Sequence, residues 1–586
     1  MCWISWLRWP DTIIDFGEQV YIAWRLSEGD VLYRDIAYFY GPLSSYLHAL
    51  LFKLFGASLL VLVGFNLLLV AGLTLLIVRI FLRLGTAFTA YLAGFTFLMV
   101  FAFAQYLWMG NHNFVCSYVY DVTHGIFLSF LAAGQYWRFA QSRKPGDLVV
   151  LGLLSGLVLL TKIEVSLAWM LAVLTGLALL ARTQKLSLQE TGRWALWFVA
   201  GLILPIAGFT LYFMVHLGWA EGFQAMLGPW TYVFSSSIRS LSFYQSVMGT
   251  DALGANLIRI ASYLVGWIAF LGMLGILGYA LRKPFERSPL LAGLGMTLWV
   301  FLFYMLQRHI PWLQLLLPLP LVLTGISAFL CFKIWTGGAV FKDSAPQLLL
   351  ATLCIFSTAL LLKIFFNTHV YHYGTALAMP GTLILFKLLT DDLPSKLDRH
   401  SVSHFFFRGS VIGGLALFTL IHFGVSAGYY SKKVFPVGYQ ADTLIGYNPN
   451  VAPNALVFQI AYDVLKEDMK EGDTLATFPT GTLMNYLLRK PNSINSISFN
   501  PGTGLLLGES RVLNDLQAAP PTHIAIVYHD YLEFGARFFG KDFGKEIYQW
   551  ILKDYESLKL IGRDPVEGEG FGIHLFKRKP ENPASP

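Results

Sequence analysis

Residues 58–80 read SLLVLVGFNLLLVAGLTLLIVRI, an almost unbroken apolar run with one charged residue, Arg79, near its end. A helix needs about 20 mostly apolar residues to cross the hydrocarbon core of a bilayer, so this run predicts a membrane-spanning helix. Similar runs follow along most of the chain, and together they predict about twelve spans. The others lie near 87–108, 117–139, 148–162, 163–181, 193–217, 256–281, 289–307, 312–332, 347–366, 373–390 and 409–430.

The composition supports the same class of protein. Of the 586 residues, 55% are hydrophobic and only 13% are charged, whereas a soluble protein carries about 25% charged residues. This composition excludes a soluble enzyme for most of the chain, and also a disordered chain, a coiled coil or a disulfide scaffold. The sequence supports neither a metal site nor disulfide bonds at its cysteines, because they have no paired spacing; they are Cys2, Cys116, Cys331 and Cys354.

The formal net charge of +7 reflects membrane topology rather than nucleic-acid binding, because the basic residues gather in alternate short loops. The positive-inside rule assigns those loops to the cytoplasm. We therefore expect a multi-pass protein of the cell inner (plasma) membrane, with a transmembrane domain at 58–430 and with 1–57 and 431–586 outside. The basic loops hold Arg79, Arg83, Arg138, Arg143, Lys144, Arg182, Lys185, Arg193, Arg282, Lys283, Arg287, Lys333, Lys342, Lys396, Arg399 and Arg408.

Residues 431–586 change in character, because charged residues become frequent and the apolar runs shorten. Apolar spacing predicts helices at Asn454–Lys470 and Lys545–Tyr555, and strands at Asp473–Phe478, His523–Tyr528 and Phe571–Phe576. This pattern predicts a small extracytoplasmic α/β domain, and it contains no nucleotide-binding or zinc-protease motif. The polar group His529, Asp530 and Glu533 follows a predicted strand and is interpreted as a solvated turn.

The stretch before the first span is unusually acidic. Residues 14–54 read IDFGEQVYIAWRLSEGDVLYRDIAYFYGPLSSYLHALLFKL, and Val20–Leu26 and Pro42–Phe55 are expected to form helices in the membrane interface. Asp15 and Asp35 bracket the first of these helices. A carboxylate beside a membrane is costly to desolvate, so each acid is either functional or an ordinary helix cap, and their spacing leaves both readings open.

The loop resembles the first outer loop of the C-type (GT-C) glycosyltransferase superfamily, and it is most similar to that of protein O-mannosyltransferases and the lipid A aminoarabinose transferase. Asp15 matches the catalytic Asp of those enzymes, Gly29 a glycine, Asp35 a second acid, and 41–43 the start of the next helix. Phe16 departs from the pattern, since the family usually has Glu there, although Glu18 is close by. Family members normally carry one span before this loop, whereas only MCWISWLRWP precedes Asp11 here, so we expect that this span is missing from the sequence.

The resemblance implies a function. It implies an inverting glycosyltransferase that moves a sugar from a polyprenyl-phosphate donor to an acceptor hydroxyl of a lipid, glycan or protein on the outer face. Asp15 and Asp35 are the expected catalytic residues, with Asp15 as the base, while Lys162 and Arg308 are expected to bind the phosphate. No cofactor is required, a divalent metal is possible but unsupported, and no nucleic acid is expected as a partner.

Further polar residues fall at the outer ends of the predicted spans and are candidates for substrate binding. Tyr118, Asp121 and His124 are spaced three apart and are expected to share a helix face, lining a cavity or forming a buried hydrogen-bond network. Lys162 reads either as a phosphate ligand or as a snorkelling lysine. The candidate binding residues are Glu18, Tyr118, Asp121, His124, Lys162, Glu164, Arg308, His309, His369 and His372.

Two other functions stay open. A transporter or flippase of lipid-linked sugars is the main alternative, although it should place its polar residues near the membrane midplane. A membrane anchor for a working C-terminal domain is weaker, because that domain has no motif of its own. If the enzyme hypothesis is right, one outer cavity should be faced by Asp15, Asp35, Lys162 and Arg308.

Overall fold

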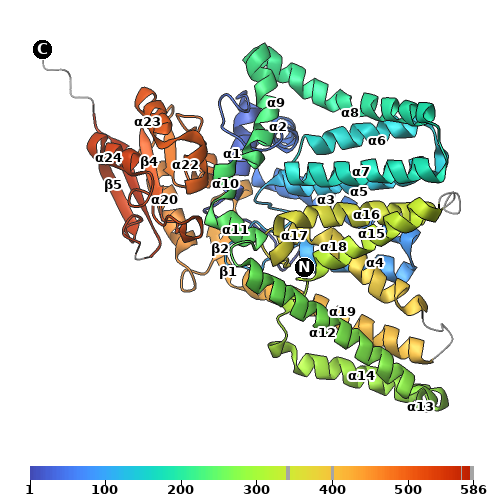
Figure 1. Cartoon of the computed structure of the whole chain (residues 1–586). Coiled ribbons are helices and arrows are strands. Elements are labelled where there is room, and N and C mark those ends of the chain that lie inside the picture. The colour runs from blue at the N-terminus through green and yellow to red at the C-terminus, as the bar shows by residue number, and fades with distance from the viewer. Residues whose placement is uncertain (338–343, 397–401, 569, 581–586) are drawn as a thin grey trace, which may run out of the picture.

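The computed structural model describes residues 1–337, 344–396, 402–568 and 570–580. It consists of a large bundle of apolar helices and a smaller α/β domain packed at one end of that bundle (Figure 1, left). The expected fold class, a polytopic helical membrane protein with a small C-terminal α/β domain, is confirmed.

Seven helices in the described part of the chain are long and apolar enough to cross a membrane, where about twelve spans were predicted. They comprise or include α3 (Leu59–Leu84), α7 (Ile163–Thr183), α8 (Leu188–Leu217), α12 (Leu253–Ala280), α15 (Leu319–Gly337), α16 (Ala345–Leu361) and α19 (Val402–Ser431). Shorter apolar helices supplement them: α2 (Leu43–Phe55), α4 (Ala87–Thr96), α6 (Pro145–Leu159) and α14 (Pro289–Met305). The other helices of this part are α1 (Phe16–Glu28), α5 (Tyr120–Ser142), α9 (Trp219–Phe234), α10 (Ser236–Arg239), α11 (Ser242–Met248), α13 (Arg282–Arg287), α17 (Gly374–Leu377) and α18 (Met379–Lys387).

Two predicted spans are interrupted. The run at 87–108 continues from α4 through a π-helical turn and leaves helical geometry after Ala102, and 373–390 is divided between α17, α18 and a second π-helical turn. Polar side chains hold the irregular segment after Ala102 by bonding to backbone groups: the Asn113 side chain accepts hydrogen bonds from the backbone N–H groups of Val115 and Cys116. This irregular backbone forms part of the candidate site.

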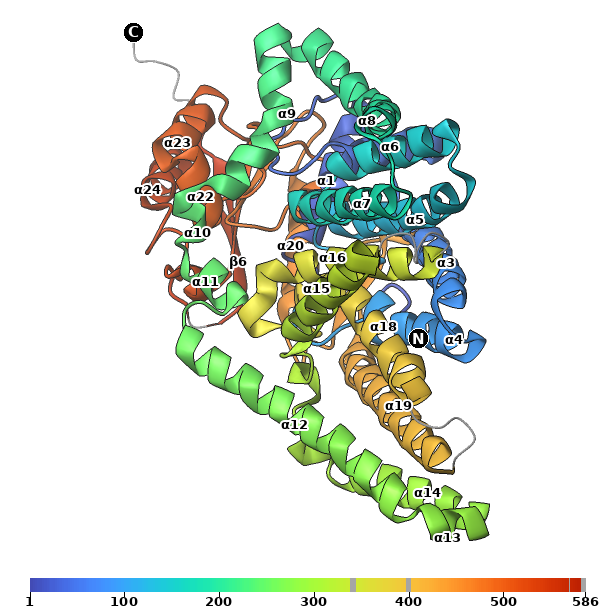
Figure 2. The same cartoon turned by 45° about the vertical axis from the view of Figure 1, so that its right-hand side comes forward.

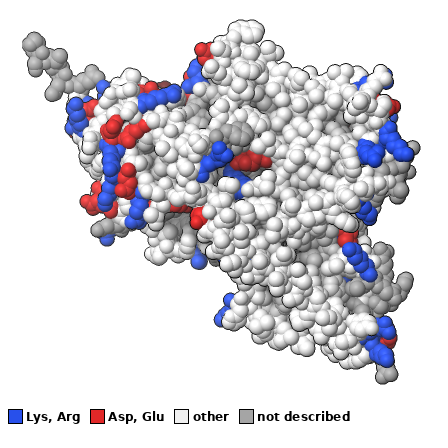
Figure 3. Space-filling model, in the orientation of Figure 1, with Lys and Arg blue, Asp and Glu red and all other residues white. Residues whose placement is uncertain are grey.

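Burial differs sharply among the long helices. The most apolar window of α16 is 72% buried, whereas that of the helix ending at Ala280 is 11% buried. The exposed faces carry large apolar side chains, such as Leu204 of α8 and Ile268 of α12, which is the pattern of a surface that meets lipid. In Figure 3 the charged side chains gather at the two ends of the molecule, with a mostly uncharged belt between them.

The C-terminal domain contains a hairpin of β1 (Lys433–Val437) and β2 (Leu444–Tyr447) and a four-stranded sheet of order β3-β4-β6-β5. Strands β3 (Leu475–Phe478) and β4 (His523–Val527) are parallel, while β6 (Gly572–Arg578) is antiparallel to both β4 and β5 (Tyr555–Gly562). Strand β5 was not predicted from the sequence. The domain's helices are α20 (Asn454–Asp468), α21 (Leu483–Leu488), α22 (Pro501–Leu507), α23 (Glu509–Ala518) and α24 (Lys545–Asp554).

The N-terminal segment joins this domain to the bundle. The backbone N–H of Ile445 donates to the carbonyl of Leu7 at 2.8 Å, and the Thr480 hydroxyl donates to the carbonyl of Ile13 at 3.0 Å. A side chain at Gly17 of α1 would lie 2.3 Å from the backbone of Leu483 in α21, so only glycine permits this approach. The loop that carries Asp15 is therefore held against the domain.

Helices α6 and α8 pack backbone to backbone. An added Cβ at Gly152 would lie 2.0 Å from the Phe198 carbonyl oxygen, and one at Gly201 would lie 2.0 Å from that of Val149. Small residues allow such close approach between membrane helices, where packing replaces the hydrophobic effect as the driving force.

We expect Gly201→Leu to separate α6 from α8 and to lower the midpoint of thermal unfolding in detergent, since overpacking a tight contact costs about 1–3 kcal/mol. Gly208→Leu in the same helix is the matched control, because nothing lies within 4 Å of a Cβ added there. Equal midpoints for the two variants would contradict this account of the packing.

Candidate functional site

A polar cavity of about 240 Å³ lies where the N-terminal loop, the irregular segment before α5 and the C-terminal domain meet. Its walls come from distant parts of the chain. The ionisable and hydroxyl-bearing residues that line it include Asp15, Glu18, Tyr38, Tyr40, His112, Tyr118, Tyr244, His372, Tyr373, His529, Tyr531 and Glu533.

Asp15 occupies the N-cap position of α1, yet its side chain makes no capping hydrogen bond. Its backbone has φ 53° and ψ −61°, a conformation that L-residues with a side chain rarely adopt and that is found preferentially at functional sites. The helix-cap explanation for Asp15 is therefore not supported. Burial raises the pKa of the Asp15 carboxyl to about 8, with further upward effects from Glu18 and Asp11 and an opposing effect from Lys162.

Glu18 lies one helical turn farther along α1 and lines the same cavity. Burial raises the pKa of its carboxyl to about 7, although a hydrogen bond with Ser498 lowers it. Two carboxyl groups thus face one cavity in a setting that favours the protonated form, and raised carboxyl pKa values of this kind are typical of catalytic acids and bases.

Lys162 lies at the break between α6 and α7 and is only 3% exposed. Its ammonium donates a hydrogen bond to the Tyr118 hydroxyl at 3.0 Å, and it lies 4.8 and 4.7 Å from the ring centroids of Tyr40 and Tyr118. Among the described residues no carboxylate lies within ion-pair distance of it. Lys162 is a buried cation held by aromatic faces.

A second cavity of about 350 Å³ lies on the other side of these tyrosines, against α7, α10, α11 and α16. Its wall is mainly apolar, but Lys162, Glu164, Arg239 and Lys363 gather in it. Lys363 forms an ion pair with Glu164, and its ammonium lies 4.3 Å from the ring centroid of Tyr373. Figure 3 shows a small group of acidic and basic side chains within the otherwise uncharged middle of this face. We call this cavity the apolar groove.

The polar cavity and the apolar groove meet at an aromatic wall. Tyr40 and Tyr373 line both. The position of Tyr40 is set by the neighbouring Gly41, where an added Cβ would lie 2.1 Å from the Leu160 carbonyl oxygen. The N-terminal loop therefore packs directly against the break between α6 and α7, which contains Lys162.

Asp35 and Arg308 lie outside this arrangement, so the expectation that they share one cavity with Asp15 and Lys162 was wrong. The Asp35 carboxylate accepts hydrogen bonds from the Val31 backbone at 2.8 Å and from the Arg34 guanidinium at 2.9 and 2.8 Å, which closes a tight turn. The Arg34 guanidinium also lowers the pKa of the Asp35 carboxyl. Arg308 and His309 lie in a short 3-10 turn, and neither lines the polar cavity or the apolar groove.

The predicted shared face of Tyr118, Asp121 and His124 is also wrong, because Tyr118 precedes α5 and only the other two belong to that helix. Asp121 accepts a hydrogen bond of 2.6 Å from Tyr38, a residue of the cavity wall. His124 is bonded to Ser44 at 3.0 Å and to Asn66 at 3.1 Å, which is a buried network between helices.

The two remaining histidine candidates, His369 and His372, have different surroundings. His372 lines the polar cavity, whereas His369 stacks on the ring of Tyr371 at 3.8 Å. In the described residues no group of three or more His, Cys, Asp or Glu side chains is placed to hold a metal ion.

Several residues of the polar cavity were not predicted from the sequence. His112 is buried, neither ring nitrogen has a hydrogen-bond partner among the described residues, and burial lowers the pKa of its imidazole to about 3. The turn that holds His529 and Glu533 was interpreted as solvated, but both residues line the polar cavity. His529 also lines a third cavity of about 340 Å³, which contains Asp11 and Lys433. His529 and Glu533 could have been recognised in the sequence as part of a polar turn directly after a buried strand.

No family model matches the chain, and no curated protein matches it. Among solved structures it is similar to the oligosaccharyltransferase AglB from Archaeoglobus fulgidus in complex with an inhibitory peptide and a dolichol-phosphate, with 11% identity over 98% of this chain and 71% of that chain and a TM-score of 0.44. It is also similar to ArnT from Cupriavidus metallidurans bound to undecaprenyl phosphate, with 13% identity over 98% and 96% of the two chains and a TM-score of 0.47. At these identities and TM-scores both are distant structural likenesses.

Proposed function

We propose that this protein is an inverting glycosyltransferase that moves a sugar from a polyprenyl-phosphate donor to an acceptor hydroxyl on the outer face of the plasma membrane. One observation carries the proposal: an apolar groove containing cations meets a cavity containing carboxyl groups at Tyr40 and Tyr373. Such a pair of compartments suits a substrate with a lipid chain at one end, a phosphate in the middle and a sugar at the other end.

The apolar wall and the cations of the groove suggest how the donor binds. Its lipid chain lies in the apolar groove, and its phosphate lies near Lys162 and Lys363, with Arg239 at the groove wall. A buried ammonium without a carboxylate partner strongly favours an anion beside it, because the interior screens charges poorly. The sugar then passes between the two tyrosines towards Asp15.

The reaction is a single displacement. Asp15 takes the proton of the acceptor hydroxyl as its oxygen attacks the anomeric carbon from the face opposite the phosphate. The bond from that carbon to the phosphate oxygen breaks, its electron pair stays with the phosphate, and Lys162 stabilises the resulting charge. Glu18 stabilises the partial positive charge on the sugar ring, as carboxylates do in glycosidases. Attack from the opposite face inverts the anomeric centre.

The acceptor approaches from the C-terminal domain. The third cavity touches the polar cavity at His529 and lies between the N-terminal segment and that domain. The positive-inside rule places this side of the bundle outside the cell. A transporter is less well supported, because the ionisable groups gather at the end of the bundle that meets the C-terminal domain rather than along a path through it.

We expect Asp15→Asn to lower transfer by a factor of about 10²–10⁴, the usual contribution of a positioned general base. The assay incubates purified protein with a panel of radiolabelled polyprenyl-phosphate sugars and membrane extract. Glu28→Gln in α1 is the matched control, because that side chain is exposed and lies at the far end of the helix.

Equal transfer by wild type and Asp15→Asn would remove Asp15 from the mechanism. Movement of donors across liposomes without transfer from any donor in the panel would favour the flippase instead.

Lys162→Gln should weaken the binding of the donor phosphate in the ground state and the stabilisation of the phosphate as a leaving group. We expect transfer to fall by about 10²–10³, as when one charge-stabilising donor is removed from an active site, and the binding of polyprenyl phosphate to fall with it. Lys53→Gln in α2 removes an exposed lysine at the other end of the interfacial loop and should change neither quantity. Unchanged polyprenyl-phosphate binding in Lys162→Gln would refute the phosphate role.

The transfer rate of the wild type should rise with pH and reach half of its maximum near pH 8, because a base with a pKa of about 8 is mostly protonated and inactive below that value. The same raised pKa lowers the stability of the folded protein as pH rises from about 4 to about 8, since the unfolded state loses this proton first.

Asp15→Asn removes that penalty, so its thermal midpoint relative to wild type should increase over the same pH range. A difference in midpoint that does not vary with pH would show that Asp15 titrates normally in the folded protein.

A further inference from the structure

A separate cavity of about 450 Å³ lies beside α12. Helices α12 and α14 run along the outer edge of the molecule, with α19 as their neighbour (Figures 1 and 2). The cavity fills the space between this outer pair and the segment that leads into α15.

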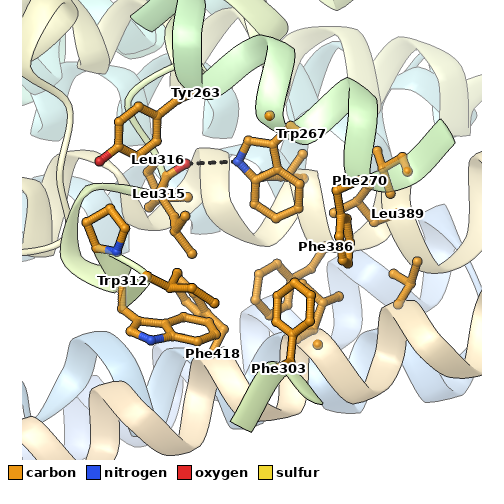
Figure 4. Close-up of a pocket in the computed structure, with 18 of the residues that line it drawn as sticks. Tyr263, Trp267, Phe270, Phe303, Trp312, Leu315, Leu316, Phe386, Leu389 and Phe418 are labelled. Atoms are coloured by element: carbon orange, nitrogen blue, oxygen red, sulfur yellow. Dashed lines mark hydrogen bonds between the residues drawn. The ribbon is translucent and has the colours of Figure 1, made fainter. Parts of the chain in front are cut away.

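The wall of this cavity is almost entirely apolar. In Figure 4 aromatic rings, including those of Trp267, Phe303, Trp312 and Phe418, surround the space. The polar atom of Trp267 is already satisfied, because its indole N–H donates to the Leu315 carbonyl at 3.1 Å. Water has few partners in such a space, so the cavity favours an apolar occupant.

The cavity is also elongated. A neighbouring cavity of about 370 Å³ shares Trp267, Leu315 and Leu389 with it and continues to Lys396. Because most of the wall belongs to helices that span the membrane, the molecules at its mouth are the chains of bilayer lipids.

A cation marks the end nearest the C-terminal domain. Arg259 lies one helical turn before Tyr263, a residue of the cavity wall. Its guanidinium donates hydrogen bonds to the side-chain oxygens of Gln314 at 2.6 Å and Asn256 at 3.2 Å, both of which are neutral. No carboxylate of the described residues lies within ion-pair distance of Arg259. The guanidinium is thus held in place by neutral groups that do not cancel its charge, and it can bind a phosphate.

We propose that this cavity binds an anionic phospholipid of the bilayer, with an acyl chain among the aromatic rings and the phosphate at Arg259. The site is distinct from the apolar groove, which lies against α7, α10, α11 and α16 and holds its own cations. The bound chain fills the space behind α12 and α14, so the lipid also holds this helix pair in place. The inference does not depend on the proposed glycosyltransferase activity.

Two glycines allow the cavity to be filled without disturbing the backbone. Gly266 of α12 and Gly414 of α19 both line it, and nothing lies within 4 Å of a Cβ added at either position. The double variant Gly266→Leu/Gly414→Leu should therefore occupy the cavity with its own side chains. Gly272→Leu is the matched control, since Gly272 lies on α12, has the same free space and does not line the cavity.

The test is native mass spectrometry of the full chain, purified in delipidating detergent and titrated with phosphatidylglycerol or with phosphatidylcholine. We expect wild type and Gly272→Leu to retain phosphatidylglycerol, and the double variant to bind it about tenfold more weakly at one site. Arg259→Gln should lose about fivefold in affinity for phosphatidylglycerol, the contribution of one basic residue at a lipid surface, and less for phosphatidylcholine, whose choline ammonium offsets the phosphate charge.

Equal retention of phosphatidylglycerol by the double variant and by Gly272→Leu would overturn the site. Equal affinity of wild type for the two lipids would overturn the proposal that the site selects an anionic lipid, and equal affinity of wild type and Arg259→Gln for phosphatidylglycerol would overturn the assignment of Arg259 to the phosphate. Arg239→Gln, which alters the apolar groove alone, should leave the affinity for phosphatidylglycerol unchanged. Weaker binding by this variant would show that the lipid occupies the apolar groove, and it would overturn the proposal.

Discussion

The candidate site depends on the buried ammonium of Lys162, which has no carboxylate within ion-pair distance in the part of the chain that the structure describes. Taking such a charge out of water costs several kcal/mol unless other groups compensate. Here the compensation comes from the Tyr118 hydroxyl and from the faces of Tyr40 and Tyr118. A desolvated cation on an aromatic face gains about 2 kcal/mol, so Lys162 remains only partly satisfied and an anion beside it is strongly favoured.

The loop that supplies one of those rings is positioned by glycine. Gly41 lies against the break between α6 and α7 so closely that a side chain would collide with the Leu160 carbonyl. Gly17 brings α1 equally close to α21 of the C-terminal domain. The N-terminal loop is thus clamped between bundle and domain, which explains how the strained backbone of Asp15 is maintained. Asp15 and Lys162 influence each other's charge across this clamp.

The aromatic wall separates two environments that a single substrate would have to bridge. On one side the apolar groove offers lipid-like surface with cations, and on the other the polar cavity offers carboxyl groups with raised pKa values. Neither environment alone specifies a reaction. Tyr40 and Tyr373 belong to the walls of both, so under the proposed function a phosphate bound at this wall would present its substituent to Asp15.

The predictions from sequence succeeded where a property is local and failed where it depends on distant contacts. Apolar run length reveals membrane helices because each helix must satisfy its own backbone hydrogen bonds in lipid, and 148–162 and 163–181 separate at Lys162 as expected. The irregular segment after Ala102 was missed, because the side chains of Asn111 and Asn113 also donate to the carbonyls of Ile14 and Trp9, which only the folded chain brings near. Asp35 and Arg308 were misplaced for the same reason, since a charge in a loop does not reveal its partner.

By itself the sequence determined the membrane class, the α/β character of 431–586 and the acidic N-terminal loop with Asp15, because composition and periodicity follow directly from the solvent each segment meets. Only the tertiary structure decided that Lys162 and Tyr373 stand at a common wall and that His112 and His529 face the same cavity as Asp15. Those residues are far apart in sequence, and their proximity results from helix packing and glycine contacts. Neither helix packing nor glycine contacts can be recognised in the local sequence.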